Sequence, residues 1–364
     1  MASIDIRSVS KEFKTGKVLD RISLSAEDGE IVAIFGPSGS GKTVLLRLVA
    51  GVEQPDAGRI LLGGRDVTDQ APEARGVGMA FQNFALFPHM SAFDNIASAL
   101  TAHKVPRDVI RTKVEKIATL LKIGHVLGHA PRELSNGQKQ RTALARALVA
   151  EPKILLLDDP LRNVDAKLRY EMRLELPSLL KASGSTVLYV TQDYKEAMAL
   201  GDRIGVLSDR DFAQIARPAE IYRWPATVSV ASLFGDPTIN LIPVEPVASS
   251  AGPKIGIGGV ALSLPPGYAH MAGKACVLGS RAENIVVEDM GTPESLPVEV
   301  LAVTPLNERT LLLLRTDDGR EILASEAGTN EAPRRHGRAF ARFDAEAVLV
   351  FDPASGRRIV PQAA

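Results

Sequence analysis

Residues 36–43 restrict the possible folds of this chain more than any other segment. They contain three glycines followed by a lysine and a threonine, after the apolar run Ile31–Phe35 and before a predicted helix over residues 44–50. This order predicts a phosphate-binding loop, in which backbone amides and the helix amino terminus surround phosphate oxygens. We expect Lys42 to meet the terminal phosphates of a nucleotide and Thr43 to ligate magnesium; an incidental glycine-rich turn is the alternative. The candidate nucleotide-binding residues here are Gly36, Pro37, Ser38, Gly39, Ser40, Gly41, Lys42, Thr43 and Val44.

A second motif follows about a hundred residues later. The apolar residues 154–157 predict a buried strand that ends in Asp158 and Asp159. Asp158 is expected to hold magnesium through water, while Asp159 faces the terminal phosphate. Two aspartates after a strand are a weak signal alone, because such residues often begin a solvated loop. Together with the phosphate loop they predict a hydrolytic nucleotide site.

Composition and charge restrict the partners. With 364 residues, 45% of them hydrophobic, the chain is long enough for two or three domains with buried cores. Its 43 basic and 43 acidic residues balance, so no overall field favours nucleic acid. The single cysteine, Cys276, excludes an internal disulfide, suits a reducing cytosol and is interpreted as a core residue. The amino terminus lacks a secretory-signal layout, and the apolar runs are far shorter than the roughly 20 residues of a membrane-spanning helix. Membrane attachment is therefore expected to come through a partner.

Two regions of different composition divide the chain. In the first, strand-like and helix-like segments alternate, and apolar positions recur at helical spacing over residues 106–123. This alternation predicts an α/β domain with a parallel sheet flanked by helices. From residues 235–243 onward, short β-like runs alternate with Gly and Pro turns, including a predicted hairpin around residues 317–319. We therefore expect an α/β domain over residues 1–235 and an all-β, barrel-like domain over residues 236–364.

A third motif lies between the two halves of the predicted site. Residues 134–141 read Leu-Ser-Asn-Gly-Gln-Lys-Gln-Arg, which resembles the signature sequence of ATP-binding cassette (ABC) proteins. Gln82 follows another apolar run, and Asp165 follows the acidic pair, in the order typical of that superfamily. The chain is therefore identified as a member of it. The resemblance implies a P-loop NTPase fold with a helical subdomain over about residues 83–155.

Three further stretches resemble the ATPases of sugar, polyol and glycerol-phosphate importers, the group of the maltose-importer subunit. They are residues 81–90 (Phe-Gln-Asn-Phe-Ala-Leu-Phe-Pro-His-Met), 235–240 (Gly-Asp-Pro-Thr-Ile-Asn) and 278–285 (Leu-Gly-Ser-Arg-Ala-Glu-Asn-Ile). The last two resemble that group's carboxy-terminal regulatory domain, so the all-β domain is expected to be OB-like, of the TOBE type. The resemblance implies an importer for a sugar, polyol, glycerol or glycerol phosphate, whose cargo is recognised by other subunits.

The resemblance also assigns site residues. In this family two nucleotide-binding domains close head to tail, and each ATP lies between one subunit's phosphate loop and the other's signature. Ser135 and the helix that follows would contact the partner's terminal phosphate; an ordinary helix N-cap is the alternative, and both roles are compatible. Phe13 would stack on adenine unless it is a core residue, and Gln82 would ligate magnesium. The signature residues assigned to nucleotide binding are Ser135, Asn136, Gly137 and Gln138.

The implied partners follow from the same resemblance. Residues 82–90 would bind a cytoplasmic helix of two integral membrane permease subunits, with Phe84, Phe87 and Met90 forming a groove, unless these side chains only pack the helical subdomain. A second ATPase subunit and, indirectly, a periplasmic or extracellular substrate-binding protein complete the set, without nucleic acid. The subunit would be peripheral, on the cytoplasmic face of the inner (plasma) membrane, with ATP and Mg²⁺ as cofactors. A soluble cassette protein of repair or translation is the alternative, but the sequence shows neither a second cassette nor a coiled-coil insertion.

Several positions depart from the family's pattern. Its catalytic glutamate is here Asp159, one methylene shorter, which withdraws the carboxylate by about 1.5 Å; misplacement of about 1 Å can cost about a hundredfold in rate. Its switch histidine is Gln192, which donates a hydrogen bond but carries no imidazole charge. Asn136 replaces the first signature glycine, and because asparagine tolerates left-handed backbone we expect the loop to work nearly normally. Arg162 replaces a small residue of the dimer contact and would need an acidic or polar partner.

These departures predict a site that binds ATP but hydrolyses it weakly, with Asp159 and Gln192 at the catalytic positions. Our hypothesis is a heterodimer whose second, fully equipped ATPase provides the strong site, which Ser135 and Gly137 of this chain would complete. A slow homodimeric ATPase and a nucleotide-gated structural subunit that never cleaves ATP are the alternatives.

Overall fold

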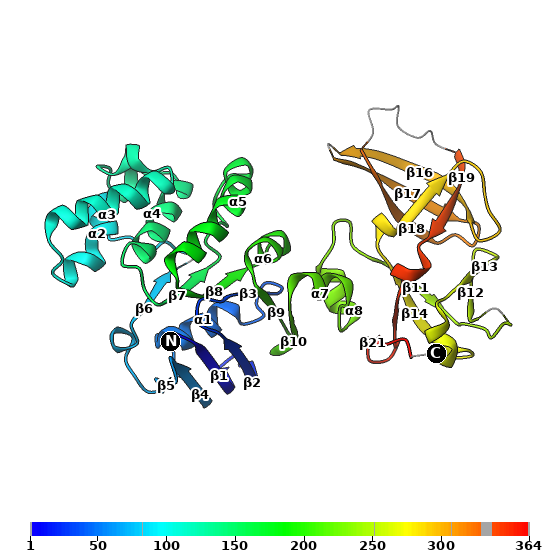
Figure 1. Ribbon diagram of the computed structural model, residues 1–364, viewed down its shortest axis with the longest axis horizontal. Helices are drawn as coiled ribbons and strands as arrows, with labels where there is room; N and C mark the ends of the chain where they lie inside the picture. The colour runs from blue at the N-terminus through cyan, green and yellow to red at the C-terminus, as the bar shows by residue number, and fades with distance from the viewer. Residues whose placement is uncertain (1, 82, 251, 307, 329–336, 363–364) are drawn as a thin grey trace. The chain divides into compact units, whose positions relative to one another are not determined.

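The structure, a computed structural model, describes residues 2–81, 83–250, 252–306, 308–328 and 337–362. The chain forms two compact units, Met1–Ala219 and Glu220–Ala364. The first combines strands with helices, and the second is built mainly of strands (Figure 1). The expected succession of an α/β fold and an all-β fold is confirmed.

A six-stranded sheet forms the centre of the first unit. Its strands, in spatial order, are β10 (Asp211–Ala216), β9 (Arg203–Ser208), β3 (Ile31–Phe35), β8 (Thr186–Thr191), β7 (Ile154–Asp158) and β6 (Val77–Ala80). The pairs between β9, β3, β8, β7 and β6 are parallel, and β10 is antiparallel to β9. Parallel neighbours need crossover connections, which here contain the helices of the unit (Figure 1). The strands expected at residues 31–35 and 154–157 are therefore neighbours of the same strand, β8.

Helices and a second sheet surround the central sheet. The helices are α1 (Lys42–Ala50), α2 (Ala92–Ala102), α3 (Arg107–Leu120), α4 (Asn136–Leu148), α5 (Ala166–Ser183) and α6 (Tyr194–Leu200). The second sheet is antiparallel, in the order β2 (Gly16–Ala26), β1 (Ile4–Phe13), β4 (Ala57–Leu62) and β5 (Arg65–Asp66). The amphipathic helix predicted over residues 106–123 is α3, which buries Ile110 and Val114 of the expected apolar stripe.

Alternate residues of the central strands face two different hydrophobic clusters. In β7, Leu155 and Leu157 join the cluster that contains α2 to α5, whereas Ile154 and Leu156 join the cluster that contains α1 and the antiparallel sheet. Successive side chains of a strand point to opposite faces, so one strand serves both clusters. Burial on both faces explains why the run at residues 154–157 is continuously apolar.

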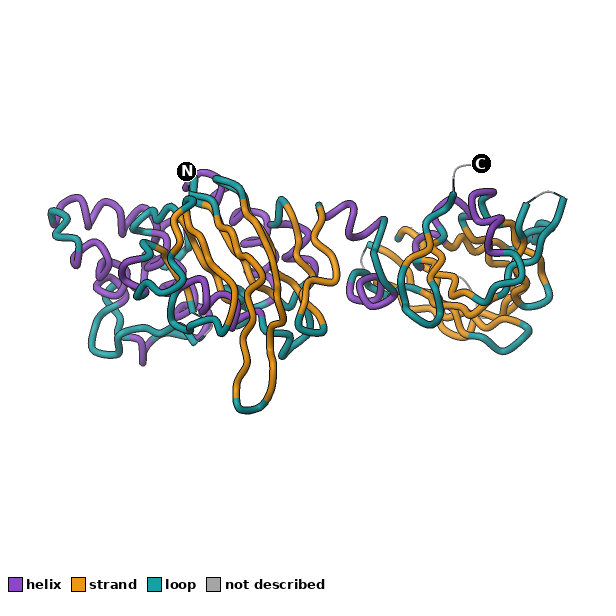
Figure 2. The backbone as a smooth tube through the Cα atoms, turned by 90° about the horizontal axis from the view of Figure 1, so that it is seen from below, coloured by secondary structure: helices purple, strands orange, loops and turns teal. Residues whose placement is uncertain are grey.

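The second unit consists mainly of strands (Figure 2). They pair antiparallel and surround a large hydrophobic cluster. Two sheets have the orders β11-β14-β20-β21 and β15-β19-β16-β17-β18, and β12 pairs with β13. The bounds are β11 (Asn240–Val244), β12 (Lys254–Ile257), β13 (Val260–Ser263), β14 (Cys276–Ser280), β15 (Ile285–Glu288), β16 (Leu296–Leu306), β17 (Arg309–Thr316), β18 (Glu321–Ala327), β19 (Gly337–Phe343), β20 (Leu349–Phe351) and β21 (Arg358–Ile359). β17 and β18 form the predicted hairpin, and Cys276 is buried in the core as expected.

Two short helices, α7 (Pro218–Arg223) and α8 (Val228–Leu233), precede these strands. Ala231 of α8 packs with Ile239, Leu349 and Phe351, which belong to the second unit. The division between the units accordingly falls within α7. The boundary predicted from sequence, between residues 235 and 236, lies after both helices and stays a prediction.

Candidate nucleotide site

The predicted phosphate loop connects β3 to α1, and two of its glycines are required by its geometry. A Cβ atom at Gly36 would come 2.2 Å from the carbonyl oxygen of Leu207, which no side chain allows. Gly41 has φ 101°, a left-handed conformation that side chains disfavour, and it immediately precedes α1. The loop therefore brings the backbone close to β9 and then turns sharply into the helix.

Lys42 is the first residue of α1 and is buried. Its Nζ donates hydrogen bonds to the carbonyl oxygens of Gly36, at 2.8 Å, and Pro37, at 2.7 Å. Burial lowers the pKa of its ammonium group, and the nearby carboxylates of Asp159 and Asp158 oppose this shift. The ammonium thus lies at the centre of the loop that is predicted to receive the phosphates.

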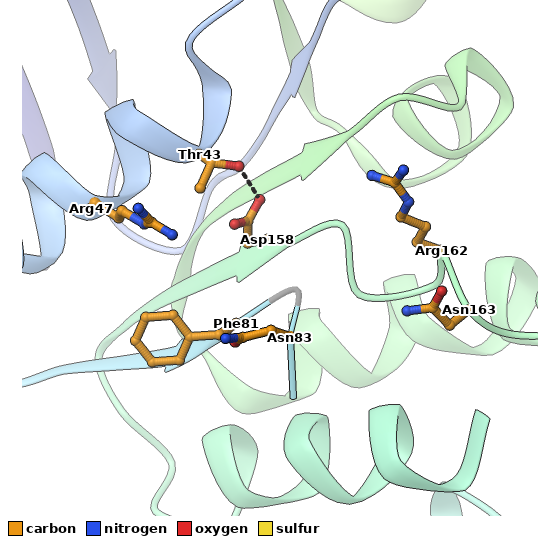
Figure 3. A pocket seen from close by; sticks show the side chains of 7 residues that line it. All are labelled: Thr43, Arg47, Phe81, Asn83, Asp158, Arg162 and Asn163. Carbon is orange, nitrogen blue, oxygen red and sulfur yellow. Dashed lines mark hydrogen bonds between the residues drawn. The ribbon is translucent and has the colours of Figure 1, made fainter. Parts of the chain in front are cut away.

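Thr43 and Asp158 bring the loop and β7 together. The Thr43 hydroxyl donates to the Asp158 carboxylate, with 3.0 Å between Oγ1 and Oδ1 (Figure 3). Burial raises the pKa of Asp158, while the hydroxyl and nearby cations lower it. Mg²⁺ prefers hard oxygen donors, and here a hydroxyl oxygen and a carboxylate oxygen lie next to each other. These two residues therefore fit the predicted magnesium site; Gln82, assigned to the same ion, lies outside the described residues.

Asp159 follows β7 with φ 49°, a left-handed conformation that aspartate adopts more readily than most residues. Its side chain is buried, and this burial raises the pKa to about 6, although Arg162 opposes the shift. The Gln192 Nε2 donates to Asp159 Oδ2 at 3.4 Å, a long hydrogen bond. The two predicted catalytic positions are thus neighbours. Arg162, expected to need an acidic or polar partner, has one in its own chain, with 3.7 Å between its guanidinium and Asp159.

A pocket of about 350 Å³ opens beside these groups (Figure 3). Figure 3 shows Arg47 and Arg162 on opposite sides of the pair formed by Thr43 and Asp158. The residues that line it are Thr43, Arg47, Phe81, Asn83, Asp158, Arg162 and Asn163. Phe13 and the signature residues do not line this pocket, as far as the described part of the chain shows.

The signature residues open α4. Ser135 is its N-cap: Ser135 Oγ accepts from the Gln138 backbone N–H at 3.3 Å, and Gln138 Oε1 accepts from the Ser135 backbone N–H at 2.9 Å. This reciprocal pair is a capping box, so the N-cap role of Ser135 is confirmed. Asn136 and Gly137 are the first helical residues. The tolerance of asparagine for left-handed backbone is therefore irrelevant at position 136, and that part of our reasoning is wrong.

Phe13 ends β1 with 37% of its surface exposed, so the alternative that it is a core residue is wrong. Lys11 lies over its ring, with 5.1 Å between Nζ and the ring centroid. An exposed aromatic face at a strand end is compatible with stacking on a base, which stays a prediction.

The segment predicted to bind membrane subunits is held by two residues that the sequence analysis did not single out. Asn95 of α2 is fully buried. Its Oδ1 accepts a hydrogen bond from the backbone N–H of Phe87, and its Nδ2 donates to the carbonyl oxygens of Phe87 and Met90. Arg146 of α4 donates to the carbonyl oxygens of Phe84 and Ala85 at 3.1 and 2.8 Å. Phe87 itself is 42% exposed, so it does not serve only to pack the helices.

Gln140 of α4 was also missed. It is buried, its Nε2 donates to the carbonyl oxygen of Asp159, and its Oε1 accepts from the backbone N–H of Asn163, each at 2.9 Å. It thereby fixes the loop after β7 to the signature helix. Its place inside residues 134–141 was a usable signal, but spacing alone does not show which distant backbone groups it bonds.

The loop, the acidic strand end and the parallel sheet together define a P-loop nucleotide-binding protein. In agreement, a family model described as ABC transporter matches residues 19–162. The dimeric structure of a post-hydrolysis state of the ATP-binding cassette MJ0796, bound to ADP and Pi, superposes with a TM-score of 0.56. The match has 29% identity and covers 59% of this chain and 98% of that one.

Curated relatives extend the match to the whole chain. The sn-glycerol-3-phosphate import ATP-binding protein UgpC of Cereibacter sphaeroides is 40% identical, over 99% of this chain and 100% of the relative. The osmoprotective compounds uptake ATP-binding protein GgtA of Synechocystis sp. is 38% identical, over 89% and 90% respectively. The chain therefore belongs to the ATP-binding proteins of the ABC transporter family, whose ATP hydrolysis is coupled to transport. No helix in the described residues combines the length and the apolar composition needed to span a membrane.

Proposed function

We propose that this chain is the ATP-binding subunit of an ABC importer whose cargo is glycerol phosphate or a related glycerol, polyol or sugar. The observation that carries the proposal is the match along 99% of the chain to an sn-glycerol-3-phosphate import ATP-binding protein. That match includes the strand-rich second unit. A second relative of this kind, UgpC of Ruegeria pomeroyi, is also 40% identical over 99% of this chain.

At its own site, the phosphate loop would surround the triphosphate with backbone amides, and Lys42 would meet the terminal phosphates. Thr43, Asp158 and Gln82 would hold Mg²⁺, which neutralises charge on the phosphates during transfer. Phe13 would stack on the adenine, and Ser135, Asn136, Gly137 and Gln138 would complete the partner subunit's site. The support in this chain is the 3.0 Å contact of Thr43 with Asp158 and the exposed ring of Phe13.

The proposed assembly contains a second ABC ATPase, two integral membrane permease subunits and an external substrate-binding protein. Residues 82–90 would receive a cytoplasmic helix of the permeases, which places the subunit on the cytoplasmic face of the membrane. The support is the exposed Phe87 on a segment fixed by Asn95 and Arg146.

We further propose that the second ATPase is not identical and that this chain's own site hydrolyses ATP weakly. The side chain of Asp159 is one methylene shorter than that of glutamate, so the carboxylate that would accept the proton is withdrawn by about 1.5 Å. Gln192 carries no charge. Phosphoryl transfer depends on positioning and on charge stabilisation, so both changes should slow it. ATP binding should persist, because neither change touches the phosphate loop.

Steady-state ATP turnover of the reconstituted transporter tests this asymmetry. Replacing both residues, Asp159→Glu with Gln192→His, is expected to raise turnover by roughly tenfold or more, since the lost geometry can cost about a hundredfold. Adding Lys42→Ala should remove that gain, because it removes the phosphate contact of the same site. Unchanged turnover after the double replacement would contradict the weak site, and transport by this chain with the permeases alone would contradict the heterodimer.

The cargo needs a separate test, because other subunits recognise it. Uptake of labelled sn-glycerol 3-phosphate into vesicles that hold the full transporter should depend on ATP and on Lys42. Competition by unlabelled glycerol, polyols and sugars would rank the members of the proposed class. A transporter that takes up none of these compounds with ATP would exclude the class.

A further inference from the structure

We propose that Arg162 contacts the terminal phosphate of ATP bound at this chain's own phosphate loop and supplies the positive charge that Gln192 lacks. The inference rests on the proposed function, because it assigns a new role within the same site. It makes Arg162 a residue that distinguishes ATP from ADP.

The backbone around Arg162 is fixed from two sides. Its carbonyl oxygen accepts a hydrogen bond from Arg169 of α5 at 3.0 Å, and its N–H donates to the Asp159 carbonyl oxygen at 3.2 Å. The next residue, Asn163, is bonded by Gln140. The backbone from which the side chain extends therefore needs no further ordering when a ligand binds, which lowers the entropic cost of binding.

The Arg162 side chain itself is loosely held. Its guanidinium is 3.7 Å from Asp159 Oδ2, beyond hydrogen-bond distance, and 47% of the side chain is exposed. It also lines the pocket that contains Thr43 and Asp158 (Figure 3). The guanidinium is thus free to exchange a weak partner for a stronger one inside the pocket.

The charges at this end of the site call for such a cation. The carboxylates of Asp158 and Asp159 lie near enough to Lys42 to act on its ammonium group, so they would repel a phosphate that Lys42 meets. Lys42 is bonded to its own loop, and Arg47 lies on the other side of the pocket. Of the two arginines that line the pocket, Arg162 is the one whose guanidinium approaches Asp159, to which the neutral Gln192 also donates. A planar guanidinium matches phosphate geometry with two parallel hydrogen bonds.

The competing explanation is that Arg162 only pairs with Asp159. The two explanations differ once that carboxylate is gone: a phosphate contact survives Asp159→Asn, and a purely structural ion pair does not. They also differ in nucleotide selectivity, because only a contact with the third phosphate separates ATP from ADP.

The experiment measures dissociation constants of ATP and ADP, each with Mg²⁺, by displacement of a fluorescent nucleotide from the full-length chain. We expect Arg162→Ala to weaken ATP about tenfold, as loss of a charge-assisted contact implies, and to change ADP less than about twofold. Arg162→Lys should keep part of the affinity for ATP. The loss should recur when Arg162→Ala is made in the Asp159→Asn background.

Arg342→Ala is the matched control. That arginine has 45% side-chain exposure and a carboxylate partner at 3.2 Å, but it lies in the second unit. Retained ADP affinity in Arg162→Ala reports an intact site. Equal losses for ATP and ADP, no loss at all, or a loss that disappears with Asp159→Asn would each overturn the inference. A wild-type chain that binds neither nucleotide would instead overturn the proposed function.

Discussion

Glu196 shows how a single buried carboxyl group can support a loop of the site. It lies in α6, with 1% of its surface exposed, and its Oε2 accepts from the hydroxyls of Tyr189 at 3.0 Å and Thr191 at 2.9 Å. Thr191 precedes Gln192, so this network fixes the turn that presents Gln192 to Asp159. Burial raises the pKa of Glu196 to about 7, although both hydroxyls oppose the shift.

The raised pKa predicts that stability falls with rising pH. Between about pH 4.5 and pH 7, folded Glu196 keeps a proton that the unfolded chain has released. Raising the pH through this window therefore lowers the free energy of unfolding, and above it the penalty is constant. Glu196→Gln removes the titration, so its stability relative to wild type should be greater at pH 8 than at pH 5, by on the order of 2 kcal/mol. Urea unfolding at the two pH values measures this, and an equal difference at both would contradict it.

At the residue scale, the predictable part of the site is the part encoded by short spacing. Lys42, Thr43 and Asp158 lie in motifs whose local order predicts their function, and the contact of Thr43 with Asp158 agrees with it. Arg162 was singled out, but its partner within the chain could not be predicted, because the contact depends on how the loop turns after β7. Glu196 was not singled out, because no pattern in the neighbouring sequence indicates that a single glutamate is buried.

At the scale of elements, the conformation of the segment after β6 depends on contacts with helix α2. In this irregular segment, the side-chain amide of Asn95 in α2 forms hydrogen bonds with backbone groups of Phe87 and Met90 that a regular helix or strand would pair with backbone. Arg146 adds contacts from α4 and lies over the Phe87 ring, 5.4 Å from its centroid. The exposed surface near Phe87 is thus shaped by side chains of the helices below it.

Removing the Asn95 amide should therefore loosen this segment. Asn95→Ala leaves partly buried backbone groups without this partner, which costs about 2 kcal/mol of unfolding free energy. We also expect weaker association with the permease subunits, measured by co-purification beside denaturant unfolding. Ser98→Ala, one turn along the same helix, is the control. Full stability and full association of Asn95→Ala would show that the segment does not depend on this amide.

The positions of strands and helices could be predicted where the spacing of apolar residues in the sequence matches the positions that are buried in the structure. The strands at residues 31–35 and 154–157 and the helix α3 were found from apolar patterns that need no distant information. The contacts of Asn95 and Arg146 were not, because both residues bond carbonyl groups of a segment that has no regular pattern. The helix expected after Ser135 begins at Asn136. We were wrong to invoke left-handed backbone at Asn136, because the Ser135 capping box already makes that residue helical.

At the scale of the whole molecule, four hydrophobic clusters of described residues each draw their buried members from one unit. Two clusters belong to the first unit and two to the second. In the second unit, the buried Asn240 of β11 joins two sheets: its Nδ2 donates to the carbonyl oxygens of Ser280 and Leu323, and its Oδ1 accepts from the Leu323 N–H. Separate cores imply that the units can unfold in separate steps.

Asn240→Ala tests this independence. It removes three hydrogen bonds at a buried position, so the transition of the second unit should lose about 3 kcal/mol. The transition of the first unit, followed by nucleotide protection, should not shift. Asp317→Ala, in the exposed turn between β17 and β18, is the control. Calorimetry that shows one common transition, shifted as a whole by Asn240→Ala, would contradict two independent cores.

The positive charge beside the phosphate loop is a local property. The chain as a whole carries 43 basic and 43 acidic residues, whereas two guanidiniums, those of Arg47 and Arg162, border one pocket. At physiological ionic strength such a field extends only about 8 Å. This field would therefore attract a diffusing nucleotide only close to the pocket. The association rate constant should not change when charged residues on distant surfaces are substituted.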